Sequence, residues 1–535
     1  MRKIKRTYGV AKRLPSSMFL KDKYTPQGDF DKLKARLVAG GHMQDRIIFD
    51  NGGSPTATTT SVFIIANIAA IEGRAVGTID FPGAFVLADM PEDGRPVYVK
   101  LNKFESSVLV RIDPIYEKYL DNYGCLTVKL KKALYGCIES ARIWYEKISS
   151  DFERMGYKKN GVDMCVFNRI ENDNTQSTIL IHVDDCLITA RNEENLSNII
   201  KEIEGRYKEL TIKRGRVIDY LGMRMEFQEL FKSGNVKITM NGYIKELLEF
   251  TKNIKGIANT PASDKLFKVS KESNLLGEKE KDFFHSVVAK CLYLAKRVRP
   301  DILTAVSFLV KRVTRSTRED MDKLERLIKY IRDTKYLGIK LEGGKNLGVY
   351  AYIDASYAVH EDYKSHSGCV IGIGRGPVYA NSKTQKLNTK SSSEAELIGI
   401  SDNSNQVIWS REFVKEQGYN VDPAVIYEDN TSTINMVKNG RSNSERTRHI
   451  AIRFYFIADR VNAKEIRVEY KRSEDMIADI LTKPLQGKQF YNLREQLLNW
   501  TEADTTSNME FAQRPLANSG GVLEKLYLDP NDKRL

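Results

Sequence analysis

The sequence predicts an α+β domain, then a mostly helical segment, and then a second domain of alternating strands and helices. Up to residue 240 the hydrophobic pattern gives strand, helix, hairpin, helix and strand in turn, an order typical of a sheet with helices on one face. Residues 242–338 have helical periodicity and are rich in Lys and Arg. From Leu347 strands and helices alternate again, after a boundary marked by Gly343-Gly344.

The first domain is expected to begin with short elements. These are a basic strand and turn at 34–49, a helix at 59–72, and short strands at 76–80, 97–101 and 126–130. A longer helix is predicted from residue 140 to 155. Its Trp144, Ile148 and Phe152 lie four residues apart and therefore share one face, which favours a role in the core.

The most informative segment is 179–190, in which two short apolar strands are joined by Asp184-Asp185. The helix that follows has Asn192 as a suitable N-cap. Strands are expected next at 217–227 and 235–240. The buried stripe of the helix is predicted to consist of Leu196, Ile199, Ile200 and Ile203.

In the helical segment, residues 283–296 and 321–332 are amphipathic, and Arg297-Val-Arg-Pro300 ends the first helix. Residues 501–535 are polar and poorly periodic, so a loosely ordered tail is expected. The second domain is expected to have strands near 347–354, 368–374, 376–381, 424–428 and 466–470, with helices at 391–417, 431–438, 449–461 and from Asp475.

Composition narrows the function. The 535-residue chain has a net charge of +14 and a pI of about 9.2, which favours a polyanionic partner, although solubility alone is the simpler explanation. Its six cysteines form no C-x-x-C pair, which excludes a zinc ribbon and fits a reducing compartment. No signal peptide is visible, and the longest apolar stretch, Val62–Ile71, is interrupted by Asn67 and is too short to cross a bilayer. The chain is therefore expected to be soluble.

Asp184 and Asp185 are costly at the tip of two apolar strands unless a cation binds there. An Asp-rich tight turn is the plainer alternative. Asp80 also ends a short strand, so three carboxylates from strand ends are available. Such a set suits two divalent ions, and hard oxygen ligands select Mg²⁺. Spacing alone does not show that Asp80 meets the hairpin.

Ten short blocks, in order, carry a resemblance to a known family over roughly residues 30–490. The chain resembles the reverse transcriptase–ribonuclease H part of a copia-type (Pseudoviridae) retrotransposon polyprotein. The blocks are Lys34-Ala-Arg-Leu-Val-Ala-Gly-Gly, Ile79-Asp-Phe-Pro-Gly-Ala-Phe, Ala133-Leu-Tyr-Gly, Arg142-Ile-Trp144, His182-Val-Asp-Asp, Tyr220-Leu-Gly222, Arg299-Pro-Asp-Ile302, Ser392-Ser-Glu-Ala-Glu396, Glu428-Asp-Asn430 and Ala478-Asp-Ile-Leu-Thr-Lys-Pro484.

The resemblance implies roles for residues of the first domain. Asp80, Asp184 and Asp185 become catalytic ligands of two Mg²⁺ ions. Lys34 and Arg36 fall where the family holds the incoming triphosphate, although a solvated strand face explains them equally. Phe85 matches the aromatic gate that rejects a 2′-hydroxyl, and core packing is its alternative.

Two positions depart from the family pattern. The family usually continues Tyr-Gly with Leu-Lys-Gln-Ser, whereas this chain has Cys137-Ile-Glu-Ser140. Glu139 therefore places a negative charge beside the nucleotide pocket, which would repel a triphosphate. His182 stands where the family has Tyr or Phe. Both changes bear on turnover more than on fold.

The second domain resembles ribonuclease H. By this resemblance Asp354, Glu396, Asp429 and Asp479 are catalytic ligands of two further Mg²⁺ ions. In the alternative interpretation they are dispersed surface charges. Glu394 is a rival to Glu396, whose Glu-Leu-Ile setting fits the family helix better. His449 resembles a family residue that contacts nucleic acid, and a structural helix-start His is an equal alternative.

The predicted fold is thus an α+β right-hand polymerase of fingers and palm (1–240) with a helical thumb and connection (241–345). An α/β ribonuclease H-like domain (346–490) and a C-terminal tail (491–535) follow. The predicted activity is RNA-directed DNA synthesis with hydrolysis of RNA in RNA–DNA hybrids. The alternative is a degenerate or domesticated fragment that binds nucleic acid without polymerising. Expected partners are an RNA template, a DNA primer, the hybrid and dNTPs, with no membrane, in the cytoplasm (as a virus-like particle) or the nucleus.

Overall fold

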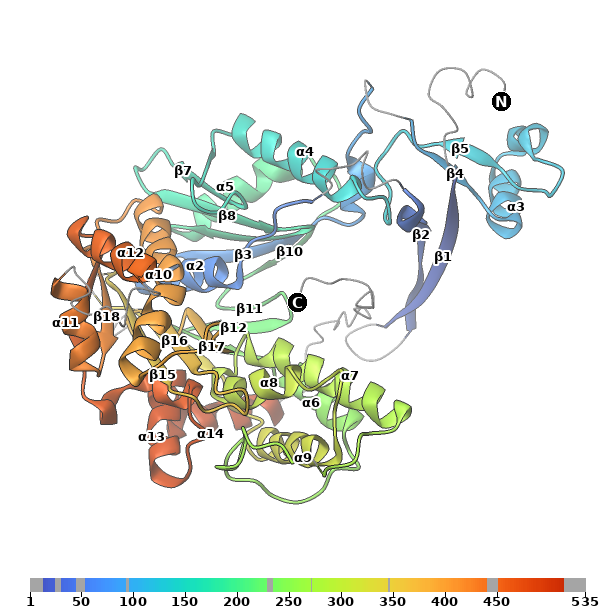
Figure 1. Cartoon of the computed structure of the whole chain (residues 1–535). Helices are drawn as coiled ribbons and strands as arrows, with labels where there is room; N and C mark the ends of the chain where they lie inside the picture. Colours follow the sequence, from blue (N-terminus) through green and yellow to red (C-terminus); the bar gives the residue numbers. More distant parts are fainter. Residues whose placement is uncertain are drawn as a thin grey trace.

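The structure, a computed structural model, describes residues 13–24, 30–44, 53–92, 96–228, 234–270, 272–344, 347–439 and 451–513. Within these ranges the strands form four sheets, around which the helices are arranged (Figure 1). In the same ranges, no helix combines the length and apolar character needed to cross a bilayer.

A six-stranded sheet lies in the first half of the chain, with strand order β10-β3-β9-β8-β7-β6 and antiparallel pairing throughout. Helix α5 (Glu193–Glu204) packs on β3 and β9 through the predicted stripe, and Asn192 caps it, as predicted. Helix α4 (Ser140–Arg154) is also confirmed. The strands are β3 (Ala75–Asp80), β6 (Lys158–Lys159), β7 (Val166–Ile170), β8 (Gln176–His182), β9 (Asp185–Ala190) and β10 (Thr211–Arg214).

A second sheet has the order β2-β1-β4-β5 and projects from the body of the molecule (Figure 1). Its long hairpin joins β1 (Arg13–Tyr24) to β2 (Phe30–Ala39), and β4 (Tyr98–Lys100) and β5 (Thr127–Lys129) complete it. Helix α3 (Lys103–Ile112), which begins at a capping box of Asn102 and Glu105, was not predicted.

The third sheet, β11-β12-β13-β14, joins segments a hundred residues apart. The single strand expected at 217–227 is a hairpin of β11 (Val217–Tyr220) and β12 (Met223–Phe227), because Leu221 and Gly222 adopt φ values of 51° and 76° and reverse the chain. Strand β14 (Ile339–Glu342) pairs with β13 (Asn235–Thr239). The helices between them are α6 (Asn241–Phe250), α7 (Glu278–Ala295), α8 (Leu303–Val310) and α9 (Arg318–Asp333).

The fourth sheet is mixed, with the order β17-β16-β15-β18-β19. Strands β15, β16 and β17 are antiparallel, whereas β18 and β19 run parallel to β15. The strands are β15 (Val349–Ser356), β16 (His366–Ile373), β17 (Tyr379–Thr384), β18 (Ala424–Glu428) and β19 (Ile466–Tyr470), and the helices are α10 (Ser392–Glu416), α11 (Thr431–Asn439) and α12 (Ala451–Asn462).

The C-terminal part corrects two expectations. The helix expected from Asp475 is wrong: η6 (Ser473–Asp475) and η7 (Ile477–Leu481) are short 3₁₀ turns, and α13 begins only at Gly487 and ends at Leu498. The loosely ordered tail expected from residue 501 begins instead with α14 (Glu502–Gln513). Asp504 in α14 forms buried ion pairs with Lys237 and Lys340, 2.8 and 2.9 Å away. This contact holds the helix on the third sheet.

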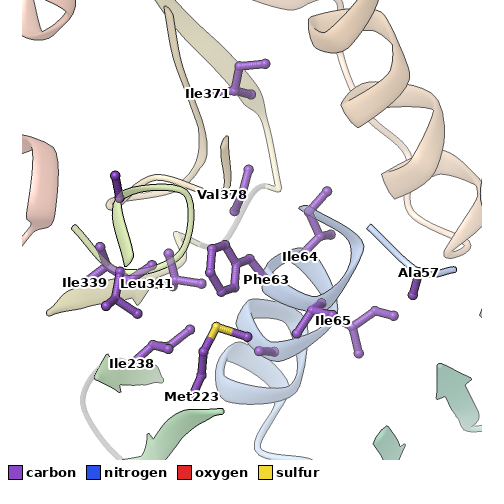
Figure 2. Packing of buried hydrophobic residues seen from close by; sticks show 14 of the residues in the cluster. Ala57, Phe63, Ile64, Ile65, Met223, Ile238, Ile339, Leu341, Ile371 and Val378 are labelled. Carbon is purple, nitrogen blue, oxygen red and sulfur yellow. The ribbon is translucent and has the colours of Figure 1, made fainter. Parts of the chain in front are cut away.

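Helix α2 (Thr59–Glu72) lies at the centre of the core. Every residue from Thr60 to Ala70 is buried, as expected of a helix that is apolar on all sides. It packs against β9, β13, β14 and α10, and so touches three of the four sheets or their helices. Figure 2 shows Phe63 of α2 beside Leu341 of β14 and Val378 of the β16–β17 connection.

A buried ion pair explains why the chain turns after α7. Arg299 donates to Asp301 over 2.8 Å, and both side chains are fully buried. Burial alone would raise the pKa of Asp301, but Arg299 and the Tyr330 hydroxyl lower it overall. Arg299 also donates to the Thr334 carbonyl over 3.0 Å, which ties the turn to the end of α9.

Asp301→Asn should lower the free energy of unfolding by about 3–5 kcal/mol, because it leaves Arg299 buried without a counter-charge. Urea denaturation followed by circular dichroism measures this loss. Glu249→Gln is the control, because its ion pair with Lys252 is exposed; it should leave the denaturation midpoint unchanged. Equal losses of stability in the two variants would show that the buried Arg299–Asp301 ion pair does not have this stabilising role.

Candidate functional site: two carboxylate clusters

The turn between β8 and β9 presents Asp184 and Asp185. Val183 begins this turn with φ of 61°, a left-handed conformation that a β-branched residue rarely adopts. Such a conformation costs about 1–3 kcal/mol and persists only where surrounding contacts enforce it. Here the Trp144 indole Nε1 donates to the Val183 carbonyl over 2.6 Å. The predicted core Trp144 is buried, and it also fixes the turn.

The structure brings Asp80 to this turn, which spacing alone did not show. Asp80 ends β3 directly opposite Asp185 on β9. The backbone N–H of Phe81 donates to the Asp184 carbonyl over 3.0 Å. From the other side, the Tyr220 hydroxyl donates to the Asp185 carbonyl over 3.3 Å. Asp80, Asp184 and Asp185 therefore form one group, the β3–β9 acid cluster.

The carboxylates of this cluster are like charges and repel one another. Burial and, to a smaller extent, the neighbouring carboxylates of Asp184 and Asp80 together raise the pKa of Asp185 from 3.8 to about 7, while Lys213 acts in the opposite direction. Half-buried carboxylates that lie this close together, one of them with a raised pKa, are typical of a cation site.

Arg36 and Phe85 meet at a residue that the sequence analysis did not single out. The Arg36 guanidinium lies 5.6 Å from the centroid of the Tyr135 ring, and the Phe85 ring lies 4.6 Å from it. Burial, followed by the charge of Asp184, raises the pKa of Tyr135. Tyr135 thus lies between these side chains and the acid cluster, and the Ala133-Leu-Tyr-Gly block was the signal for it. Lys34 lies two residues before Arg36 on β2 and therefore points to the same face.

Glu139 is buried, and Gln44 covers its carboxylate. The Gln44 amide donates to Glu139 Oε2 over 2.8 Å, and its carbonyl accepts from the Ile138 N–H over 2.8 Å. Glu139 Oε1 is also buried and has no hydrogen-bond partner among the described residues. His182, the other departure from the family, lies at the end of β8, 3.3 Å from the Ala57 carbonyl.

A second cluster lies at the ends of strands β15 and β18. Oxygen atoms of Asp354 (β15), Glu396 (α10) and Asp429 (after β18) all lie within 4.8 Å of one another. Glu394 is elsewhere engaged, because its carboxylate accepts from the Lys390 N–H over 2.7 Å at the start of α10. Asp479 of η7 is linked to these three acids by Lys483. The Lys483 Nζ lies 2.7 Å from Asp479 and 3.6 Å from Asp354. We name these four acids the β15–β18 acid cluster.

Burial and like charge also dominate this second cluster. Burial, then the charges of Asp354, Glu428 and Asp429, raise the pKa of Glu396 far above its ordinary value. Burial and Asp354 raise the pKa of Asp479 to about 7, against the influence of Lys483. The sequence analysis missed Glu428, Lys483 and Thr482, although all three lie inside family blocks. Thr482 donates to Asp354, and Glu428 is fully buried beside the cluster. His449 lies outside the described residues.

Comparison with known proteins agrees with this geometry. Residues 11–261 match the family model described as reverse transcriptase (RNA-dependent DNA polymerase). The chain as a whole is a relative of the Pol polyproteins of copia-type retrotransposons, which confirms the resemblance. The mixed sheet β17-β16-β15-β18-β19 has its acids on β15, on α10 and directly after β18.

The relatives are long polyproteins. A Pol polyprotein from transposon RE1 of Arabidopsis thaliana is 29% identical over 89% of this chain and 31% of its own length. The Ty1-DR6 Gag-Pol polyprotein of Saccharomyces cerevisiae is 25% identical over 90% of this chain and 27% of its own. The chain thus spans about a third of these relatives. Among solved structures, the protease–reverse transcriptase of prototype foamy virus is 11% identical, covering 93% of this chain and 74% of that chain, with a TM-score of 0.23.

In the absence of divalent ions, Asp185→Asn should stabilise the protein at pH 8 by about 2 kcal/mol. Between pH 4 and 7 the folded protein keeps a proton on Asp185 that the unfolded chain has lost. Stability therefore falls as the pH rises through this window, and the cost is complete above the folded pKa of about 7.

Thermal unfolding in EDTA at pH 5 and pH 8 measures this effect, and the gain of the variant should be larger at pH 8. Asp322→Asn, which removes an exposed carboxylate from α9, should give the same small change at both pH values. A variant that is less stable than the wild type at pH 8 would show that Asp185 carries no such penalty.

Proposed function

We propose that this chain is an RNA-directed DNA polymerase with an associated ribonuclease H, and that both activities use two-metal phosphoryl transfer. The observation that supports this most directly is the pair of separate acid clusters. Each gathers carboxylates near strand ends, and in each at least one carboxyl has a strongly raised pKa because it is desolvated and its neighbours are also acids. One core holds both clusters.

Each segment of the chain has its own role in this proposal. Residues 1–240 serve as fingers and palm, with the β1–β2 hairpin reaching over the β3–β9 acid cluster as fingers. Residues 241–345, with α6 to α9, serve as thumb and connection. Residues 346–490 are the ribonuclease H domain, and 491–535 form the C-terminal tail, whose two helices support the core.

Both clusters fit Mg²⁺, because their donors are hard carboxylate oxygens and their mutual repulsion is relieved by a bound cation. Asp80, Asp184 and Asp185 would hold it in the polymerase, and Asp354, Glu396, Asp429 and Asp479 in the ribonuclease. When bound, two Mg²⁺ ions activate an attacking oxygen and neutralise charge on the phosphoryl group. The protein contributes rigidity, since Trp144 and Phe81 lock the turn that carries Asp184.

In the polymerase, Lys34 and Arg36 neutralise the triphosphate of the incoming dNTP. Phe85 and Tyr135 form an aromatic wall against the sugar, which leaves no room for a 2′-hydroxyl. Glu139 brings a negative charge close to this pocket. Gln44 reduces the cost by donating a hydrogen bond to its carboxylate.

In the ribonuclease, Asp354 and Glu396 occupy the buried floor of the cluster, and Asp429 lies at its edge. Lys483 lies beside Asp354 and Asp479, where it limits their repulsion. The substrates follow from these assignments: an RNA template, a DNA primer, dNTPs and the RNA–DNA hybrid. With a net charge of +14, binding should depend mainly on phosphate contacts and fall steeply with salt.

Primer extension on poly(rA)/oligo(dT) with Mg²⁺ tests the polymerase, and cleavage of labelled RNA in a hybrid tests the ribonuclease. Asp184→Asn should abolish extension and retain cleavage, whereas Glu396→Gln should do the reverse, with losses of at least about a hundredfold in each case. Each variant is thus the folding control of the other. A folded wild-type chain that binds the hybrid but does neither reaction would favour the degenerate binder.

Glu139→Gln should lower the KM for dTTP about five- to tenfold, because a neutral amide keeps the acceptor for Gln44 and removes a charge that repels the triphosphate. Steady-state extension with varied dTTP measures it. Glu146→Gln is the matched control and should leave KM unchanged, because Glu146 is exposed on α4, the helix that begins directly after Glu139. An unchanged KM in Glu139→Gln would mean that this carboxylate does not face the nucleotide.

A further inference from the structure

A cavity of about 190 Å³ lies outside both acid clusters, where three distant segments meet. The first turn of α2 supplies Thr59 and Phe63, the end of α7 supplies Lys296 and Arg297, and the β16–β17 connection supplies Val378 and Tyr379. Figure 2 shows Phe63 and Val378 close together in the core beneath it. The cavity therefore bridges the reverse transcriptase domain, the helical segment and the ribonuclease H-like domain.

The charged side chains that line this cavity are both cations. Among the described residues that line it, the charged ones are Lys296 and Arg297. Neither forms an ion pair within the described part of the chain. Lys296 donates only to oxygens of β17, over 3.1 Å to the Asn381 side chain and 3.5 Å to the Ala380 carbonyl. A nearby cation, Lys383, adds to the positive potential.

Arg297 is held in place without a counter-ion. Its guanidinium stacks on Tyr293, 3.5 Å from the ring centroid. Its Nε is buried and has no acceptor among the described residues, and burial lowers the pKa of the side chain. Its Nη1 donates to the Tyr293 carbonyl over 3.5 Å, and a guanidinium on an aromatic face keeps its remaining donors for the oxygens of a ligand.

The cavity also adjoins the β3–β9 acid cluster. The Tyr293 hydroxyl that supports Arg297 donates to the Leu221 carbonyl over 3.4 Å. The next residue back, Tyr220, donates to the carbonyl of Asp185. Arg297 is therefore connected to the hairpin that carries the aspartates through Tyr293 and the Tyr220–Leu221 turn, by two hydrogen bonds, and Lys296 contacts the ribonuclease H-like sheet.

We propose that this cavity binds a phosphate group through Arg297 and Lys296. Arg297 is suited to a bidentate contact with two phosphate oxygens, and Lys296 to a point-charge contact at the mouth. The phosphate is either part of the backbone of a bound nucleic acid or a free phosphate ion. The first of these sources rests on the proposed function.

The test compares Arg297→Gln and Lys296→Gln with Lys279→Gln, which removes the same charge from an exposed position on α7. Binding of a labelled RNA–DNA hybrid is measured by fluorescence polarisation from 50 to 300 mM KCl, without divalent ions. Each cavity variant should weaken binding about five- to tenfold and lower the salt slope by about one, whereas Lys279→Gln should leave the slope unchanged. Circular dichroism and thermal unfolding identify any variant that fails to fold.

A second measurement identifies the source. Inorganic phosphate should raise the unfolding temperature of the wild type relative to KCl of equal ionic strength, and not that of Arg297→Gln, if the site takes a free ion. A changed hybrid slope without this effect assigns the site to a backbone phosphate.

Unchanged slopes together with no phosphate effect would overturn the proposal. If the wild type extends primers while the cavity variants bind hybrid normally, the cavity assignment fails and the proposed polymerase stands. If the wild type does not bind hybrid at all, the proposed function fails, and the thermal measurement still decides whether the cavity binds phosphate.

Discussion

The burial of helix α2 is the constraint on which the rest of the structure depends. Eleven consecutive residues, Thr60 to Ala70, are shielded from water, so this helix is stable only if other elements cover all its sides. The covering elements, β9, β13, β14 and α10, come from distant parts of the chain. The polar Asn67 within it donates to the Ile373 carbonyl of β16 over 2.7 Å, which fixes the rotation of the helix against the fourth sheet. The same contacts set where the two acid clusters lie.

The acid clusters do not stabilise the fold, and the apolar core around them supplies the stability that they lack. Asp80 ends β3, Asp185 begins β9, Asp354 lies near the end of β15 and Glu396 lies near the start of α10. The strands therefore carry the packing, and the charges lie at or near their ends. The turn at Val183 shows the same division, since an unfavourable backbone conformation is held by Trp144, which is itself buried among Phe81 and Tyr207. The substitutions that remove charge should therefore increase stability while they reduce activity.

Local patterns in the sequence were enough for the elements with strong periodicity. Helices α2, α4 and α5, the Asp184-Asp185 hairpin and the break after α7 were predicted, because spacing, caps and Pro300 act within a few residues. The pairing of β14 with β13 was not predictable, because it depends on contacts a hundred residues apart. The meeting of Asp80 with the hairpin was inferred from family resemblance. Tyr135, Glu428 and Lys483 were missed because their importance comes from neighbours in space. Helix α14 was missed because its stability comes from the ion pairs of Asp504, and its own hydrophobic pattern is weak.

The position of β14 has a consequence for how the chain folds during synthesis. Until the ribosome has passed residue 342, β13 has an unpaired edge, and the face of α2 that β14 and Ile371 cover later is open to water. Unpaired strand edges invite pairing between molecules. The segment that matches the reverse transcriptase family model is therefore fully synthesised well before its core is closed, because β14 follows only after the helical segment.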